Sequence, residues 1–232
     1  MLLKRLSLPR GQDYQSLRKV TLLMVGLHNA GKTAIARVVK GESSTDVVPT
    51  MGISRIDLRH ENCDVTLFDL GGGKKTRETW KYYFGESYGL IFVVDSSNLN
   101  NIQASKEAIY EIVKHPRMMG KPVLILANKQ DKEGALSEEC LIKELALEQL
   151  ATEQKCVCQI KTCSAMTGTG KKRDAKIICG FDWILGYIQN NYEKLKVQVE
   201  RDTKTLEICW QNTERDNQMR EPKKTENPEF II

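Results

Sequence analysis

The chain lacks the features that mark membrane-spanning and secreted proteins. Among its 232 residues no apolar run approaches the roughly 18–20 residues that cross a bilayer, and the strongest runs, such as Gly89–Val94, have the length of a strand. The basic N-terminus is not followed by an apolar stretch of about 7–15 residues, so a secretory signal is not expected. We therefore expect a cytoplasmic protein without a transmembrane span.

The seven cysteines include no C-x-x-C pair and are odd in number, which argues against a disulfide framework. Reduced and mostly buried thiols are expected. A metal site at Cys156, Cys158 and Cys163 is the less favoured alternative, because the spacing does not match zinc modules and the nearest histidine, His115, is far away in sequence. Cys156 and Cys158 alternate as same-face neighbours on a strand do.

The formal charge of +5 is concentrated at the N-terminus. Residues 1–40 hold eight Lys or Arg and one acid, Asp13, so their local charge is +7 and the other 192 residues sum to −2. A nucleic-acid-binding face would carry such charge over the domain. The pattern therefore argues against nucleic acid as a partner and favours a surface or phosphate contact near the N-terminus.

Apolar runs that alternate with amphipathic stretches predict one α/β domain with helices on both faces of the sheet. At about 150 residues per domain, the length fits one core with extensions. A hairpin is expected at Glu61 and Asn62, so a mostly parallel six-stranded sheet should have one antiparallel strand. The predicted strands are Val20–Val25, Ile53–His60, Cys63–Asp69, Gly89–Asp95, Pro122–Ala127 and Cys156–Cys163, and the predicted helices are Lys32–Val39, Leu99–Lys114, Ser137–Leu150 and Phe181–Asn191.

The composition changes after the predicted domain, which we expect over residues 21–191. Residues 192–232 carry eight basic and nine acidic residues in 41 positions. Leu195, Val199, Leu206 and Trp210 recur at spacings of four and seven, which predicts a helix that continues out of the domain. A solvated helix is favoured over a coiled-coil partner, since only two heptads are readable. Disorder is expected from about Thr213.

A phosphate-binding loop is predicted between the first strand and the first helix. It has the pattern G-x-x-x-x-G-K-T and consists of Gly26, Leu27, His28, Asn29, Ala30, Gly31, Lys32 and Thr33. Its glycines let backbone amides point at phosphate oxygens, and the helix N-terminus adds a partial positive charge. Lys32 would reach the β- and γ-phosphates, and the Thr33 hydroxyl would bind Mg²⁺. A chance match is the weaker alternative in this strand-loop-helix context.

A second motif selects the base. Asn128, Lys129, Gln130 and Asp131 follow an apolar strand, at the carboxyl end where open α/β sheets bind nucleotides. The Asp131 carboxylate can accept both guanine N1–H and the 2-amino group, a donor pair that adenine does not offer on that edge. Ser164 and Ala165, after the next strand, would supply a backbone amide to guanine O6. The alternative is a solvated loop, and the motif order favours guanine.

Two segments between these motifs are expected to sense the γ-phosphate. Asp69 ends a strand and can hold the Mg²⁺ shell, while the amide of Gly72 meets the γ-phosphate. Thr50 lies in the loop before the hairpin and is placed to close on Mg²⁺. Such contacts would order both loops with GTP and release them with GDP.

Taken together, the motifs resemble those of the small GTPases of the ADP-ribosylation-factor (Arf) family, over roughly Lys19–Asn191, and within the family its ciliary branch. The resemblance implies a P-loop NTPase fold, a G domain that binds GTP or GDP with Mg²⁺. The family residues are Gly26–Thr33, Pro49–Gly52, Gly71, Gly72, Arg77, Trp80, Tyr83 and Phe84. The stretches typical of the branch are Lys19–Leu27, Phe68–Gly73, Val93–Ser97 and Ala127–Leu136.

Two positions depart from the Arf pattern. Gly73 stands where the family usually has a glutamine that orients the attacking water, so we expect GTP binding with very slow intrinsic hydrolysis and assign no catalytic residue. His28 stands where the family commonly has aspartate. An exposed loop histidine is favoured over a phosphate contact from an imidazolium.

The resemblance also implies partners. The Ile53–Asp69 hairpin would slide along the sheet between the GDP and GTP states, so the two states would have different surfaces, and GTP-state effectors would bind only one of them. Another Arf-like GTPase is an expected partner, through the switch region and the helix after the domain. Residues 1–20 form a basic amphipathic segment with Leu2 in place of a myristoylated glycine, so residues 1–10 would contact membranes only transiently.

Three functions remain open from the sequence. A GTP-dependent switch, in the cytoplasm or the cilium, is favoured. A nucleotide-bound scaffold that never cycles is the second, because Gly73 cannot orient a water. A P-loop kinase or ATPase is the least favoured of the three, because no acceptor-binding or arginine-rich lid segment is apparent and the base motif favours guanine.

Overall fold

A six-stranded sheet forms the centre of the computed structural model, which describes residues 17–44, 50, 52–60, 62–168 and 173–220 and omits the side chains of 207–220. The strands lie in the order β2-β3-β1-β4-β5-β6, and only β2 and β3 pair antiparallel. The predicted fold is thereby confirmed. The strands are β1 (Arg18–Val25), β2 (Ile53–His60), β3 (Cys63–Leu70), β4 (Gly89–Asp95), β5 (Val123–Asn128) and β6 (Cys158–Thr162).

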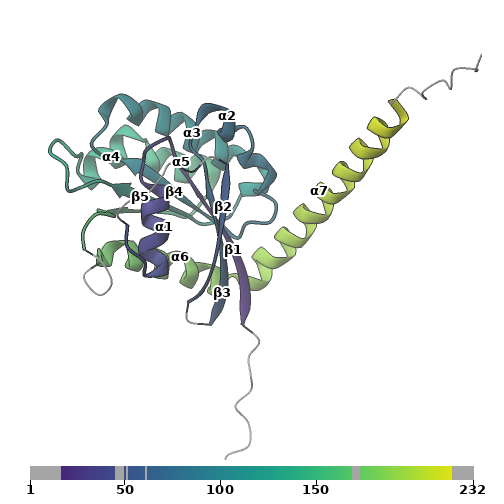
Figure 1. Ribbon diagram of the computed structural model, residues 1–232, viewed down its shortest axis with the longest axis horizontal. Helices are drawn as coiled ribbons and strands as arrows, with labels where there is room; N and C mark the ends of the chain where they lie inside the picture. Colours follow the sequence, from purple (N-terminus) through teal and green to yellow (C-terminus); the bar gives the residue numbers. More distant parts are fainter. Residues whose placement is uncertain (1–16, 45–49, 51, 61, 169–172, 221–232) are drawn as a thin grey trace, which may run out of the picture.

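Helices cover both faces of the sheet (Figure 1). Leu22 and Met24 of β1 pack into a core with α1 and α6, while Leu23 and Val25 pack with α3, α4 and α5 on the other face. The alternation along one strand therefore serves two cores. The helices are α1 (Lys32–Lys40), α2 (Lys74–Arg77), α3 (Ile102–Lys114), α4 (Glu138–Glu144), α5 (Leu147–Gln154), α6 (Ala175–Asn190) and α7 (Tyr192–Arg220), with short 3₁₀ turns η1 (Trp80–Tyr82), η2 (Leu99–Asn101) and η3 (Pro116–Met118).

The predicted helix Ser137–Leu150 is interrupted, and the prediction of one continuous helix is wrong. Ser137 caps α4, but Ala146 adopts a left-handed conformation with φ of 49° between α4 and α5. Leu145 and Leu147 are both buried. Residues two apart point to opposite sides of one helix, so the break is what lets both side chains reach the core.

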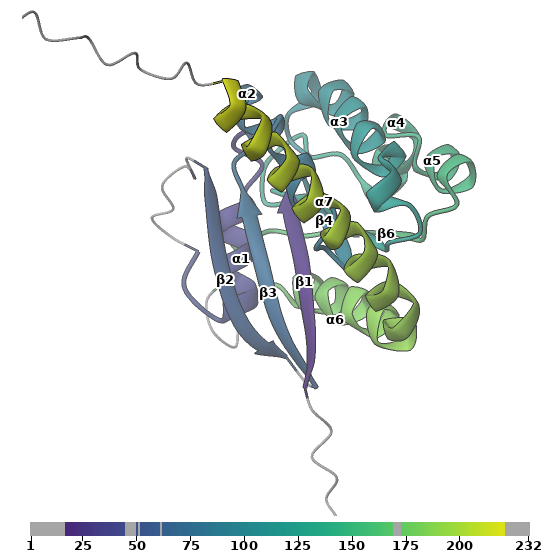
Figure 2. The same ribbon diagram turned by 90° about the vertical axis from the view of Figure 1, so that its right-hand side faces the viewer.

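The helix after the domain docks instead of leaving as a solvated helix. Leu195 and Val199 are buried in the core shared with α1 and α6, and the Tyr192 ring stacks on Tyr88 with centroids 5.6 Å apart. Figure 2 shows α7 starting beside α6 and passing the sheet, while Figure 1 shows its distal part projecting outward. The prediction of a solvated helix is therefore wrong for its first half.

The helix also extends beyond Thr213, where disorder was expected, as far as Arg220. Tyr192–Arg220 contains neither glycine nor proline, so no residue in it interrupts the backbone hydrogen bonds; the next proline is Pro222. Residues 1–16, which make up most of the predicted amphipathic segment 1–20, and residues 221–232 lie outside the described part of the chain. Among the described helices, none is both long and apolar enough to cross a bilayer.

A buried lysine lies between α7 and the segment after η1. Lys121 is fully buried and donates a hydrogen bond from Nζ to the Phe84 carbonyl at 2.7 Å. Burial lowers the pKa of Lys121 to about 8, an effect that the buried Asp202 of α7 partly opposes. Leu206 lies close to Gly85, so α7 contacts this segment as well as the core.

Docking of α7 predicts a measurable contribution to stability. Leu195→Ala should lower the free energy of unfolding by about 2 kcal/mol, because it removes a buried side chain and leaves a cavity. Val197→Ala is the matched control, since Val197 lies on the same helix and is 67% exposed. Urea unfolding compares the two variants, and equal losses would contradict a docked α7.

Candidate functional site

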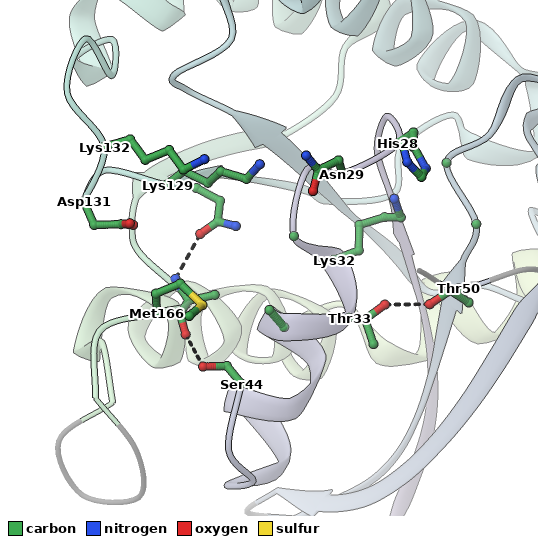
Figure 3. Close-up of a pocket in the computed structure, with 16 residues that line it drawn as sticks. His28, Asn29, Lys32, Thr33, Ser44, Thr50, Lys129, Asp131, Lys132 and Met166 are labelled. Atoms are coloured by element: carbon green, nitrogen blue, oxygen red, sulfur yellow. Dashed lines mark hydrogen bonds between the residues drawn. The ribbon is translucent and has the colours of Figure 1, made fainter. Parts of the chain in front are cut away.

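The carboxyl ends of the parallel strands meet at one edge of the sheet, where a cavity of about 400 Å³ opens. Figure 3 shows Thr33 and Thr50 at one end of it and Asp131 at the other. The predicted residues that line it are His28, Asn29, Gly31, Lys32, Thr33, Thr50, Gly72, Asn128, Lys129, Asp131 and Ala165. The other predicted residues do not line the cavity but form hydrogen bonds with residues that do; they are Gly26, Leu27, Ala30, Asp69 and Ser164.

The loop between β1 and α1 has the shape that its glycines require. Gly26 has φ of 148°, and a Cβ there would lie 2.2 Å from the Val93 carbonyl oxygen. Gly31 has φ of 94°, and a Cβ would lie 2.1 Å from Nδ2 of Asn128. Both positions therefore exclude other residues, and α1 starts directly after the second glycine with its N-terminus at the cavity.

Lys32 lies at the phosphate end of the cavity. It is buried, and its Nζ donates to the carbonyls of Gly26 at 3.0 Å and Leu27 at 2.9 Å. Burial lowers the pKa of Lys32 to about 8, an effect that the Asp69 carboxylate partly opposes. An anion would stabilise the buried Lys32 ammonium most, because its two hydrogen-bond partners are neutral carbonyls that do not compensate its charge.

Three oxygen-bearing side chains from separate segments converge beneath the loop. Thr33 Oγ1 lies 2.6 Å from Thr50 Oγ1 and donates to Asp69 Oδ2 at 2.5 Å, while Thr50 Oγ1 lies 3.3 Å from the same oxygen. Asp69 is fully buried, and its Oδ1 has no hydrogen-bond partner within the described residues. Burial raises the pKa of Asp69, against hydrogen bonds from Thr33 and Thr50 and the charge of Lys32. This set of hard oxygens fits Mg²⁺.

The opposite end of the cavity is built around Asn128. Its Nδ2 donates to the Ala30 carbonyl at 2.9 Å, and its Oδ1 accepts from the Ala165 amide at 3.0 Å. Asn128 thus joins the phosphate-binding loop to the loop after β6. Ser164 Oγ donates to Asp131 Oδ1, which brings the two predicted base-contacting segments together.

Lys129 is held by an ion pair at the same end. Its Nζ lies 2.6 Å from Asp95 Oδ2, and both side chains are largely buried. Burial acts to raise the pKa of Asp95, but the hydrogen bonds from Lys129 and Ser97 outweigh it and lower the pKa below its usual value. The aliphatic stem of Lys129 is therefore fixed along the cavity wall.

The amide predicted for guanine O6 already has a partner in this structure. The Ala165 amide donates to Asn128, and the Ser164 amide donates to Asp174 Oδ2 at 2.8 Å. A base oxygen would share the Ala165 amide with Asn128 or displace it. The sequence did not indicate Asp174, which also caps α6.

The segment after β3 lies directly against the phosphate-binding loop. A Cβ at Gly72 would lie 2.4 Å from the Gly26 carbonyl oxygen, so only glycine permits this approach. Gly73 has an ordinary φ of −66°, and the nearest atom to a Cβ there is Thr76 Oγ1 at 3.7 Å. A second hollow of about 380 Å³ adjoins this point. His28 is exposed, as predicted, and borders both hollows, so the geometry is also compatible with a phosphate contact.

Sequence reasoning missed several residues that line the cavity. Ser44 donates to the Ala165 carbonyl at 2.5 Å but belongs to no motif. Four of the missed residues adjoin predicted site residues in the sequence, which was the available signal: Ala34, Gly71, Lys132 and Met166. The missed residues are Ala34, Ser44, Gly71, Lys132 and Met166.

Known proteins are similar to this chain in sequence and in fold. The sequence matches the profile of the ADP-ribosylation factor family over residues 11–187. ADP-ribosylation factor-like protein 13B of Chlamydomonas reinhardtii is 30% identical over 189 residues, which cover 82% of this chain and 35% of that protein. ADP-ribosylation factor-like protein 2 of Arabidopsis thaliana is 36% identical over 168 residues, which cover 72% of this chain and 86% of that protein.

A solved structure agrees with these relatives. The Arl6 BBS3 small GTPase from Trypanosoma brucei, with the bound nucleotide analogue GppNp, superposes with a TM-score of 0.63 at 29% identity and covers 78% of this chain and 99% of that one. The chain spans only 35% of the length of the Chlamydomonas relative. The profile match, the fold and the assembled motifs together show that the chain belongs to the ADP-ribosylation factor family of small GTPases.

Proposed function

We propose that this small GTPase is a molecular switch that binds GTP or GDP with Mg²⁺ and binds effectors in its GTP state. The observation that carries the proposal is the convergence of Thr33, Thr50 and Asp69 beside the buried Lys32. The two threonine hydroxyls would ligate Mg²⁺, with Asp69 holding its shell. Bound Mg²⁺ would neutralise phosphate charge, while Lys32 and the N-terminus of α1 hold the β- and γ-phosphates.

The switching element would be the loop that carries Thr50. Thr33 and Asp69 lie on the structured elements α1 and β3, whereas Thr50 comes from the segment before β2. Loss of the γ-phosphate would remove the contact that holds this loop on the ion. The β2–β3 hairpin follows directly, so its surface would differ between the two states, and an effector would bind one of them.

Base recognition provides the test of the proposed ligand. The Asp131 carboxylate would accept from guanine N1–H and the 2-amino group, so we expect ITP, which lacks the amino group, to bind roughly 10-fold more weakly than GTP. ATP should bind more weakly still, because neither donor remains. Competition against a fluorescent GTP analogue measures all three nucleotides.

The matched variants are Asp131→Ala and Glu133→Ala, since both side chains are exposed in the same loop. Asp131→Ala should reduce the preference for GTP over ITP, whereas Glu133→Ala should preserve it. Equal affinity of the unmodified protein for GTP and ATP would instead support the P-loop kinase or ATPase alternative.

Gly73 favours a second candidate, a GTP-bound scaffold or an exchange factor for another Arf-like GTPase. The residue carries no side chain to orient a water, so the GTP state would persist until exchange or a partner ends it. We propose a role in membrane or ciliary trafficking, supported by the similarity to ADP-ribosylation factor-like protein 13B and to the Arl6 BBS3 small GTPase. GTP-state effectors, a second Arf-like GTPase and transient membrane contact through residues 1–10 remain the proposed partners. Failure of bound GTP both to exchange and to be hydrolysed over many hours would favour the non-cycling scaffold, whereas exchange without hydrolysis would still fit the switch.

A further inference from the structure

Two cysteines lie in contact at the start of β6, away from the nucleotide cavity. The Sγ atoms of Cys156 and Cys158 are 3.2 Å apart, which is within hydrogen-bond range for sulfur. The other cysteines whose side chains are described have no such sulfur neighbour. A disulfide has its sulfurs about 2.0 Å apart, so this pair needs only a small movement to bond.

The fold brings the two thiols together through the turn that ends α5. Lys155 adopts a left-handed conformation with φ of 48° directly after the helix, and Cys156 then lies with its Sγ 4.0 Å from the Leu150 carbonyl. Cys158 starts β6, where it pairs with Val123 of β5. Because both ends of this short segment are anchored, the two sulfurs are held near each other before any reaction.

The environments of the two thiols differ. A hydrogen bond from Cys158 lowers the pKa of Cys156, while the same contact together with burial raises the pKa of Cys158. The lower pKa favours the attacking role for Cys156, which is buried, and the resolving role for Cys158, which is half-buried. Within the described residues no group of three or more His, Cys, Asp or Glu could hold a metal ion, so the pair is not part of a larger metal cluster.

We propose that Cys156 and Cys158 form an oxidation site that closes to an intramolecular disulfide with a peroxide. The Cys156 thiolate attacks one oxygen of hydrogen peroxide, the O–O bond breaks, and hydroxide leaves as a sulfenic acid forms. The Cys158 sulfur then attacks the Cys156 sulfur, and the sulfenic oxygen leaves with the Cys158 proton as water. Both sulfurs are oxidised together by two electrons, and the peroxide is reduced.

The chain permits a direct test, because trypsin cleavage after Lys155 and Lys161 releases a peptide that contains only these two cysteines. The full-length protein is treated with hydrogen peroxide, quenched with catalase, alkylated and digested. We expect this peptide to lose two hydrogens in mass and to escape alkylation. A thiol reductant should restore double alkylation. The exposed Cys140 and Cys179 should remain alkylated at the same peroxide dose.

Variants separate the two roles. Cys158→Ser should leave a sulfenic acid at Cys156 that a dimedone probe labels, whereas Cys156→Ser should reduce labelling of the pair by at least about 10-fold. Cys140→Ser is the control and should leave the disulfide yield unchanged. The proposal is overturned if the peptide stays doubly alkylated at doses that oxidise Cys140, or if it gains oxygen instead of losing hydrogen. Covalent dimers through either cysteine would overturn it too. None of these outcomes depends on nucleotide binding.

Discussion

Replacing Gly73 by glutamine is expected to raise the rate of single-turnover GTP hydrolysis by on the order of 100-fold. A carboxamide at this position, beside the phosphate-binding loop, can accept from and donate to a water that attacks the γ-phosphate. The backbone accommodates the change, since φ is −66° and the nearest atom to a new Cβ is Thr76 Oγ1 at 3.7 Å. The adjoining hollow of about 380 Å³ has room for the side chain.

Release of phosphate from preloaded GTP measures this effect, with Gly73→Leu as the control. Leucine fills similar space but neither donates nor accepts a hydrogen bond, so its hydrolysis rate should stay near that of the unmodified protein. Nucleotide affinity should change little in both variants. An equal increase with leucine would mean that packing, rather than orientation of water, limits hydrolysis.

Lys32→Met is expected to weaken GTP binding by on the order of 100-fold or more, because removal of one partner of a buried charge pair costs about 2–5 kcal/mol. The ammonium is buried, and its hydrogen-bond partners among the described residues are the neutral Gly26 and Leu27 carbonyls, so a bound phosphate would give it an anionic partner in addition to the charge of the nearby Asp69. Methionine keeps the length of the aliphatic stem. The loss should therefore come from the charge.

Titration with a fluorescent GTP analogue measures the affinity. Lys40→Met is the control, because Lys40 ends the same helix and is an exposed partner of Glu42. Its affinity should match that of the unmodified protein. Thermal unfolding without nucleotide shows whether Lys32→Met still folds. A folded Lys32→Met variant with unchanged affinity would refute the assignment of Lys32 to the phosphates.

The sequence was most informative where local chemistry decides the structure. The bounds of β2 and β4 agree with the predicted Ile53–His60 and Gly89–Asp95. β4 is buried along nearly its whole length, which is why its continuous apolar run was sufficient to predict a strand with the right bounds. β1 begins earlier than predicted because Arg18 and Lys19 pair with β3, and their exposed side chains carry no apolar signal.

Predictions failed where distant segments decide the outcome. The charged face of α7 suggested a solvated helix, yet a few apolar residues, Leu195 and Val199 among them, suffice to dock it. No glycine or proline in the sequence indicates the interruption at Ala146. In the structure the Ala146 carbonyl accepts a hydrogen bond from the Tyr110 hydroxyl of α3 at 3.1 Å. Such contacts outweigh local helix propensity.

The sequence by itself determined the phosphate-binding loop, the order of the motifs and the alternation of strands and helices. Each depends on neighbouring residues, such as a glycine that permits a positive φ or an apolar run that needs burial. Only the tertiary structure decided that Thr33 meets Asp69 across 36 positions, and that the Ala165 amide bonds to Asn128. It also decided that α7 packs on the domain. Strand pairing and packing set these distances, and no local pattern encodes them.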